Sequence, residues 1–320
     1  MFNKSGMNRV AESLHKAEKA QGLDSVLCNP HEAENETLWE LAKDADVHVT
    51  HTHFPDWFRR RCTKKHKVIY IVHGTPEHIF QSSVEDGLAG SYGHGDSWML
   101  FQYWMQNANH IVTFWERHQK IIKSFCDKNT PVHHIPLGVD KTFWCPGPSK
   151  GKFSGNPSLF TSENCHYIKW PLDLFLLWPW VYPHIKTPPC LHAAYLPTDQ
   201  HRWFFPLVNR NGASYGSHIS RGCFEHADLL NALRSVDYYI GLVRYGDHNR
   251  MCLEANAAGT KTISYAGNPY SDFWLPEGDQ RITAERLTKI LNGQVKPRKK
   301  TVVPEAIETA QAMKDIYESL

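Results

Sequence analysis

The chain has 320 residues and a formal net charge of only +2, with 41% hydrophobic and 21% charged residues. This composition is ordinary for a globular protein, and it excludes a fibrous or intrinsically disordered chain. The length suits two domains of about 150 residues each, which would enclose a cleft between them.

No run of about 18 apolar residues is present, and the start, MFNKSGMNRV, lacks the apolar stretch of a secretory signal. We therefore expect a cytoplasmic protein without an integral membrane segment. The eight cysteines form no CxxC pair, which favours free thiols over a zinc site or a disulfide framework.

In the first half, Val10, Leu14 and Ala17 recur at helical spacing and predict a helix that ends at Gly22. Strands and helices then alternate, as a parallel α/β sheet requires. The predicted strands cover residues 24–30, 46–53, 67–74 and 109–115, and the predicted helices cover 37–45, 97–108 and 116–126.

The segment CPGPSKGKFSGNP, residues 145–157, is rich in Gly, Pro and Ser and is the best linker candidate. The alternation resumes after it, with strands predicted at 158–163, 190–196, 213–222 and 237–243, and helices at 171–185, 227–236, 252–258 and 304–320. We therefore predict an α/β fold of two Rossmann-like domains facing a cleft, residues 1–146 and 147–302, with the helix in 303–320 packing back on the first domain.

Ligands of open parallel sheets bind outside the carboxyl ends of the strands, where loops lead into helices. Ser5 and Gly6 precede the first helix, where backbone N–H groups and the helix dipole favour an anion. His73 follows the apolar strand VIYIV and is either a capping donor or a substrate contact.

Three histidines alternate near the end of another predicted strand, at His48, His51 and His53. His51 and His53 share a face, but no carboxylate or cysteine completes a metal site at a known spacing, so we expect no metal. The nearby basic run, Arg59–Lys67, indicates either a solvated face or a phosphate-rich partner.

The most specific segment is YGDHNRMCLEANAAGT, residues 245–260, which follows a strand and opens a small-residue helix ended by Gly259. A carboxylate near such a helix start, here Glu254, can accept both ribose hydroxyls of a nucleotide. The alternative is a surface glutamate on an alanine-rich helix.

The sequence LEANAAGTKTISYAG resembles the nucleotide-sugar motif of family 4 retaining glycosyltransferases of the two-domain GT-B type. SGMNR, residues 5–9, is similar to the family's glycine loop and its arginine, here Arg9. VIYIVHG resembles its strand ending in a cleft histidine, and HHIPLGVDKTFWCPG its signature before the linker. Lys169 stands where the family has its diphosphate-binding lysine.

The resemblance implies a hexosyl- or pentosyltransferase that uses a UDP- or GDP-linked sugar and no further cofactor. Glu254 would hold the ribose, and Lys169 would neutralise the diphosphate leaving group. The acceptor would pass Gly6 and His73, and the anomeric configuration would be retained.

The sequence also departs from the family pattern. The family's first glutamate falls on Gly246, so the adjacent Asp247 is the candidate contact to the sugar. The arginine that accompanies the lysine falls on Glu163, and Arg244 or Arg250 is the candidate replacement. No strand precedes the glycine loop, which indicates a compact, divergent member or a truncated start.

The acceptor is open at this stage: a glycan, a small alcohol or a hydroxymethylated base in phage DNA. The basic run Arg59–Lys67 and the stretch KPRKK keep modified DNA among the candidates. A non-catalytic module that binds a sugar nucleotide or a nucleic acid is the alternative from another class. An NAD-dependent dehydrogenase is disfavoured because no GxGxxG follows a strand.

Overall fold

A computed structural model describes most of the chain. The described residues are 6–28, 34–51, 56–77, 79–80, 83–84, 97–162, 171–195, 206, 210, 216–221, 225–244 and 249–320. The chain divides into two compact units, the first made of residues 1–140 and 304–320 and the second of residues 141–303.

The first unit contains a four-stranded parallel sheet with strand order β1-β2-β3-β4. Its strands are β1 (Val47–His51), β2 (Lys67–Val72), β3 (His110–Thr113) and β4 (Val132–His134). The helices whose bounds fall within the described residues are α1 (Gly6–Ala20), α2 (Asn35–Ala42), α3 (Asp56–Arg61), α5 (Ser97–Asn107), α6 (Glu116–Lys123) and α12 (Ala306–Tyr317).

One face of this sheet is covered by α5 and α6. Val68, Tyr70 and Val72 alternate along β2 toward that face, where they pack against Trp104 of α5 and Ile122 of α6. All five side chains are buried. This apolar layer explains why the aromatic sequence of residues 97–108 forms a helix here, as predicted.

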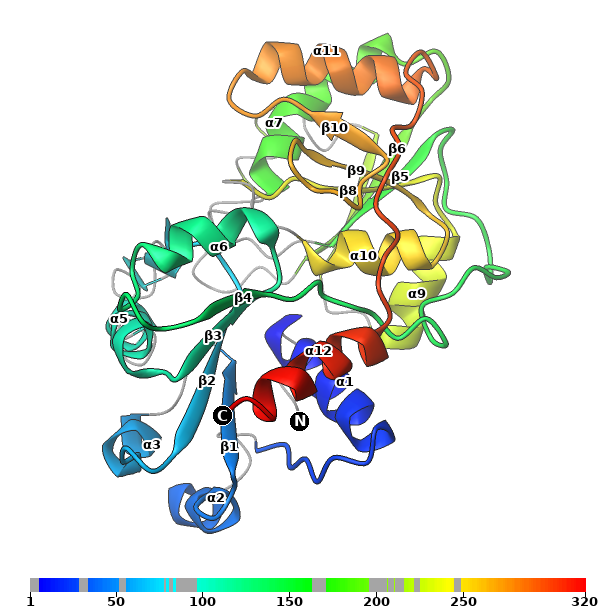
Figure 1. The fold of residues 1–320 in the computed structure, drawn as a ribbon. Coiled ribbons are helices and arrows are strands. Elements are labelled where there is room, and N and C mark those ends of the chain that lie inside the picture. Colours follow the sequence, from blue (N-terminus) through cyan, green and yellow to red (C-terminus); the bar gives the residue numbers. More distant parts are fainter. Residues whose placement is uncertain are drawn as a thin grey trace. The chain divides into compact units, whose positions relative to one another are not determined.

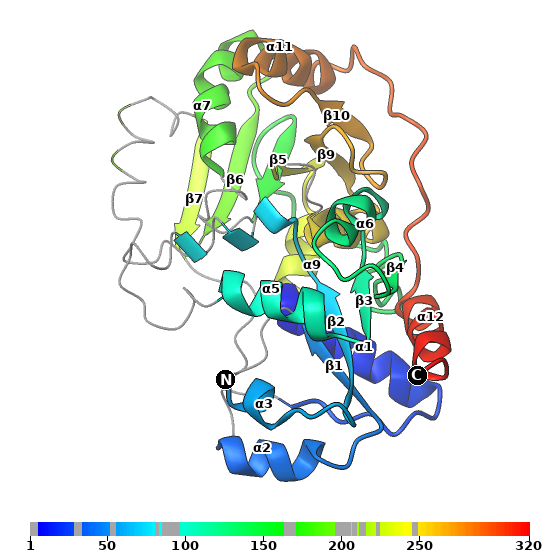
Figure 2. The same cartoon turned by 60° about the vertical axis from the view of Figure 1, so that its left-hand side comes forward.

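The C-terminal helix α12 lies beside α1 within the first unit (Figures 1 and 2). The Tyr317 hydroxyl donates to the carboxylate of Glu18 on α1. At the other end of α12, Gly138 lies so close to Glu305 that an added Cβ would stand 2.1 Å from the carbonyl oxygen. The two distant chain segments can therefore cross only where residue 138 is a glycine.

The second unit contains six parallel strands in the order β7-β6-β5-β8-β9-β10. They are β5 (Ser158–Thr161), β6 (Cys190–Tyr195), β7 (Ser217–Arg221), β8 (Tyr238–Gly241), β9 (Lys261–Tyr265) and β10 (Phe273–Leu275). Counted within the unit, this is the 3-2-1-4-5-6 order of the classical dinucleotide-binding fold.

Helices cover both faces of this second sheet. They are α7 (Pro171–Val181), α9 (His226–Arg234), α10 (Arg250–Ala257) and α11 (Gln280–Leu291), and a 3-10 turn, η2, follows α7 at Tyr182–His184. α7 and α11 pack side by side on one face, whereas α9 and α10 lie on the other (Figures 1 and 2). Trp178 of α7 and Leu287 of α11 share the buried core with Ile240 and Ile263 of the sheet.

The structure corrects one predicted strand and adds elements that the sequence analysis did not predict. Residues 24–28 have no regular structure, and Val26 is 61% exposed. Ser25 is held by side-chain hydrogen bonds with His15 and Glu18 instead of a strand ladder. The added elements are α3, β4, β9, β10 and α11.

Candidate functional site

The topological switch point of the second unit lies between β5 and β8, from which the chain continues toward opposite edges of the sheet. Open α/β sheets bind ligands at the carboxyl ends of such strands. Ser162 directly follows β5, and its hydroxyl oxygen is buried without a hydrogen-bond partner in the part of the chain that the structure describes. A buried hydroxyl without a partner costs free energy, so this position is suited to a polar ligand group.

Helix α10 begins beside the other strand of the switch point. Asn249 is its N-cap: its side-chain oxygen accepts from the Met251 backbone N–H at 2.7 Å, and its amide nitrogen donates to the Tyr239 hydroxyl at 2.7 Å. A Cβ on Gly241 would stand 2.8 Å from that amide nitrogen. Gly241 and Tyr239 of β8 therefore fix where α10 starts.

Glu254, the predicted ribose contact, lies on α10 and has no exposed side-chain surface. Its Oε1 accepts a hydrogen bond of 2.7 Å from Nε of Arg250, one helical turn earlier. The Arg250 side chain is also largely buried, at 11% exposure. A ribose can meet this carboxylate only where the residues that cover it move away.

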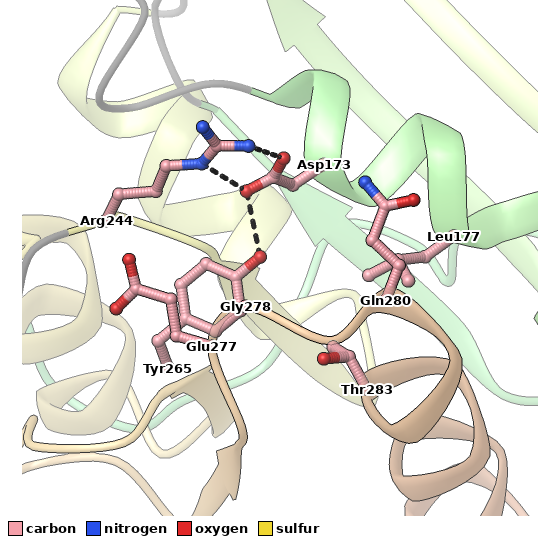
Figure 3. A pocket seen from close by; sticks show the side chains of 8 residues that line it. All are labelled: Asp173, Leu177, Arg244, Tyr265, Glu277, Gly278, Gln280 and Thr283. Atoms are coloured by element: carbon pink, nitrogen blue, oxygen red, sulfur yellow. Dashed lines mark hydrogen bonds and ion pairs between the residues drawn. The ribbon is translucent and has the colours of Figure 1, made fainter.

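Arg244, the predicted second cation, follows β8 and is held by a carboxylate. Its Nε and Nη2 both donate to Asp173 in the first turn of α7, the former at 2.8 Å. The Tyr265 hydroxyl at the end of β9 donates to the same carboxylate at 2.8 Å (Figure 3). Burial and then the charge of Asp173 raise the pKa of Tyr265, so this phenol stays protonated as the donor.

These three residues line a pocket of about 230 Å³ between the starts of α7 and α11 (Figure 3). The other lining residues are Leu177, Glu277, Gly278, Gln280 and Thr283. Small-molecule sites usually enclose about 300–1,000 Å³. This pocket therefore has room for part of a nucleotide sugar and not for the whole of it.

The carboxyl edge of the first unit's sheet carries three rings from three neighbouring strands. His51 ends β1, His73 follows β2 and Phe114 follows β3. Nδ1 of His51 lies 2.9 Å from Nε2 of His73, and the His73 and Phe114 ring centroids are 5.5 Å apart. Burial lowers the pKa of His51 to about 4, so this imidazole is neutral at pH 7.

Several predicted site residues lie outside the described part of the chain: Ser5, His53, Glu163, Lys169, Gly246 and Asp247. Gly6 is the first residue of α1, and Arg9 lies one turn further along, partly buried. The structure thus brings Arg244 to the carboxyl edge of the second unit and His73 to that of the first, and it encloses Glu254 within the second unit.

Sequence reasoning missed three residues at the second unit's edge: Ser162, Asp173 and Tyr265. One signal was available for Asp173, which is the only charged residue in the apolar helix PLDLFLLWPWV. A lone carboxylate in such a helix is almost always paired. No comparable signal marked Tyr265, because its contact with Asp173 spans 92 positions in the sequence.

The two basic stretches are partly engaged within their own units. Arg61 pairs with Glu36 and lies over the Trp39 ring, whereas Lys64 and Lys65 are exposed. In KPRKK, the Arg298 guanidinium stacks 3.7 Å from the Trp274 ring centroid, and Lys300 pairs with Asp272 at 2.8 Å. The cationic surface open to a polyanion is therefore smaller than the sequence indicates.

The described residues show neither a metal-binding cluster nor a membrane-spanning helix. No group of three or more histidine, cysteine, aspartate or glutamate side chains is arranged to hold a metal ion among them. Within the same part of the chain, no helix combines the length and the hydropathy needed to cross a bilayer.

Comparison with known proteins gives structural matches only. No protein-family model matches the chain, and no curated protein matches it. Among solved structures, sucrose-phosphate synthase from Thermosynechococcus elongatus is 15% identical, with a TM-score of 0.69 over 98% of this chain and 93% of that chain.

Two further structures match over most of their length. Anabaena Alr3699/HepE in complex with UDP and glucose is 12% identical, with a TM-score of 0.63 over 89% of this chain and 81% of that chain. A trehalose-6-phosphate synthase, studied for glycosyl transfer with retention, is 15% identical, with a TM-score of 0.57 over 89% and 73% of the two chains. The chain therefore has the two-domain GT-B fold of these glycosyltransferases, as its α/β units with parallel sheets indicate.

Proposed function

We propose that this protein is a retaining glycosyltransferase that moves a sugar from a nucleotide-diphosphate sugar to a hydroxyl acceptor. The observation that carries the proposal is the fold match with a sugar-transferring enzyme over 98% of this chain and 93% of the other. The donor is UDP-linked in this proposal, since one structure of the same fold holds UDP and glucose. Retention is supported by the likeness to the trehalose-6-phosphate synthase.

The second unit is the donor domain in this proposal. Its switch point carries Ser162, whose buried hydroxyl has no hydrogen-bond partner among the described residues, and Arg244, whose side chain is 27% exposed. Lys169 stands two positions before α7 in the sequence, and the positive end of a helix dipole favours phosphate. Glu254 binds the ribose once the residues that bury its carboxylate move away. Asp247 contacts the sugar.

Transfer breaks the bond between the anomeric carbon and the diphosphate oxygen, the acceptor oxygen forms the new bond on the same face, and the acceptor proton passes to the leaving diphosphate. Negative charge develops on the leaving diphosphate, so a fixed cation lowers the barrier. Lys169 supplies that cation, and Arg244 adds a second one held in place by Asp173. No metal or other cofactor is assigned a role.

The acceptor side is the carboxyl edge of the first unit, where Gly6 opens α1 and His73 follows β2. This edge offers imidazole nitrogens and aromatic faces and no fixed charge among the described residues His51, His73 and Phe114. Such groups suit a neutral hydroxyl, which favours a glycan or a small alcohol. For a modified DNA base, binding would have to weaken steeply with salt.

Donor turnover tests the proposal. The protein is incubated with UDP- and GDP-sugars, and released nucleotide and transferred sugar are measured separately. We expect Lys169→Ala to lower kcat by about 100-fold or more, the usual cost of losing one group that stabilises developing charge. Lys186→Ala, an exposed lysine of the same unit, is the matched control. Tight binding of a sugar nucleotide with no turnover would identify a binding module instead, and wild-type turnover by Lys169→Ala would remove that residue from the mechanism.

A further inference from the structure

The strand register explains why two histidines 22 positions apart meet. His51 pairs with Ile71 in the parallel ladder of β1 and β2. Because side chains alternate faces along a strand, Ile71 and His73 lie on the same face of the sheet. His73 is therefore the next residue after Ile71 on the face that also carries His51. Nδ1 of His51 and Nε2 of His73 lie 2.9 Å apart.

The contact between Nδ1 of His51 and Nε2 of His73 is a hydrogen bond, in which one of the two nitrogens carries the proton. The pKa of His51, lowered by burial to about 4, leaves its ring neutral, and a neutral imidazole has one N–H donor and one acceptor. Two nitrogens bound to one tetrahedral zinc ion would lie about 3.3 Å apart, given Zn–N bonds of about 2.0–2.1 Å. A separation of 2.9 Å is instead that of a direct hydrogen bond.

On the other side of His73, Phe114 makes an edge-to-face contact with the ring, at 64° between planes. The register Ile71↔Val112 continues to His73 and Phe114, so this contact also follows from the ladder. The His73 ring is thus held by a hydrogen bond from one neighbouring strand and an aromatic edge from the other.

We propose that His51 is a positioning residue, which fixes the ring orientation and the tautomer of His73 for contact with the substrate. The inference rests on the proposed function, in which His73 meets the acceptor or the transferred sugar. The hydrogen bond to His51 engages Nε2 of His73, and a neutral imidazole carries its proton on only one of its two ring nitrogens. Whether Nδ1 donates or accepts is then decided by which way the shared proton points.

A double-mutant cycle on kcat tests this assignment. We expect His51→Leu to lower kcat about tenfold, the factor that corresponds to one hydrogen bond, with the donor KM within about twofold. His51→Asn places an amide near the position of Nδ1 and should recover kcat to within about threefold. In a His73→Ala background, His51→Leu should have no further effect on kcat.

Equal losses from His51→Leu in both backgrounds, or no loss in either, would overturn the assignment. Nitrogen-15 NMR of the histidine rings gives a readout that needs no activity, with the His73 signals identified by their loss in His73→Ala. One dominant His73 tautomer in the wild type and a mixture in His51→Leu supports the positioning role, and the same mixture in both contradicts it. If the wild type transfers no sugar, the proposed function fails while this spectrum still decides the role of His51. His51→Asn keeps both measurements usable if His51→Leu does not fold.

Discussion

The carboxyl edges of the two sheets are built from different chemistry. In the first unit, the imidazoles of His51 and His73 and the phenyl ring of Phe114 meet. In the second unit, two arginine–carboxylate pairs flank β8: Arg244 with Asp173 and Arg250 with Glu254. Both edges come from parallel strands of similar length, so the difference lies in the side chains and not in the architecture.

This difference matches the two substrates of a glycosyl transfer. An edge of imidazole and aromatic rings can bind a hydroxyl, whereas the donor brings a diphosphate that needs fixed cations. The cost also differs. A buried ion pair costs free energy to desolvate, and the protein is strongly destabilised when one partner is lost. A buried neutral histidine destabilises the folded protein only at a pH low enough to protonate it.

The largest effect should come from breaking the buried pair of the second unit. Glu254→Ala leaves the Arg250 charge without its carboxylate, and we expect the free energy of unfolding to fall by about 3–5 kcal/mol in urea titrations. The control is Glu285→Ala on α11. Glu285 pairs with Arg281 at the same i,i+4 spacing, but this pair is exposed, with 57% of the glutamate side chain accessible. That loss should stay below about 1 kcal/mol. Equal losses would show that the two pairs do not differ as their burial indicates.

A double replacement separates the stability of this pair from its proposed function. Arg250→Met together with Glu254→Leu replaces the buried ion pair by apolar side chains, which is often neutral for stability. We expect a folded protein with an unchanged unfolding midpoint and a much higher KM for the UDP-sugar. Unchanged KM in the folded double variant would remove Glu254 from donor binding.

Acid should act mainly on the first unit. Burial lowers the pKa of both His48 and His51 on β1 to about 4 from the ordinary 6.5, and the charge of His66 adds to the effect at His48. The unfolded chain therefore binds more protons than the folded one between these values, so stability falls as pH falls from about 6.5 to about 4. The loss is on the order of 3 kcal/mol for each histidine. It is fully developed below pH 4 and absent above pH 6.5.

His48→Leu isolates one of these two contributions, because Nε2 of His48 is buried without a hydrogen-bond partner in the described structure. The free energy of unfolding of the His48→Leu variant, measured between pH 4 and 6.5, should vary less steeply with pH than that of the wild type. The exposed His184 provides the control His184→Leu. If both variants keep the wild-type slope, buried histidines do not set the acid response of this unit.

The sequence predicted most of the fold because most elements carry local signals. Alternation of apolar strands with amphipathic helices indicated both units. The predicted strand at 24–30 was wrong because a short apolar run looks the same whether it joins a ladder or, as Val26 does, faces solvent. Helix α11 was missed although its N-cap, Asp279, accepts from the Ile282 N–H, a pattern readable in advance.

The site was less predictable than the fold. Arg250 and Glu254 lie one helical turn apart, so their pairing follows from the sequence, but the complete burial of Glu254 does not. The meeting of His51 and His73 requires the register of two strands, and period-two reasoning alone paired His51 with His53. The contact of Arg244 with Asp173 joins segments 71 positions apart, and only the packed sheet and α7 bring them together.

The smallest predicted effect concerns this last contact. Asp173→Asn keeps an oxygen that can accept one hydrogen bond, but it removes the charge that Arg244 and the Tyr265 hydroxyl share. We expect the free energy of unfolding to fall by about 1–2 kcal/mol and the KM for the nucleotide sugar to rise, since Arg244 loses its fixed orientation. Asp228→Asn, which changes an exposed aspartate in the first turn of α9, should alter neither quantity. A stability loss without any change in KM would make the Arg244–Asp173 pair a structural feature of the second unit, and the difference between the two edges would then rest on the Arg250–Glu254 pair.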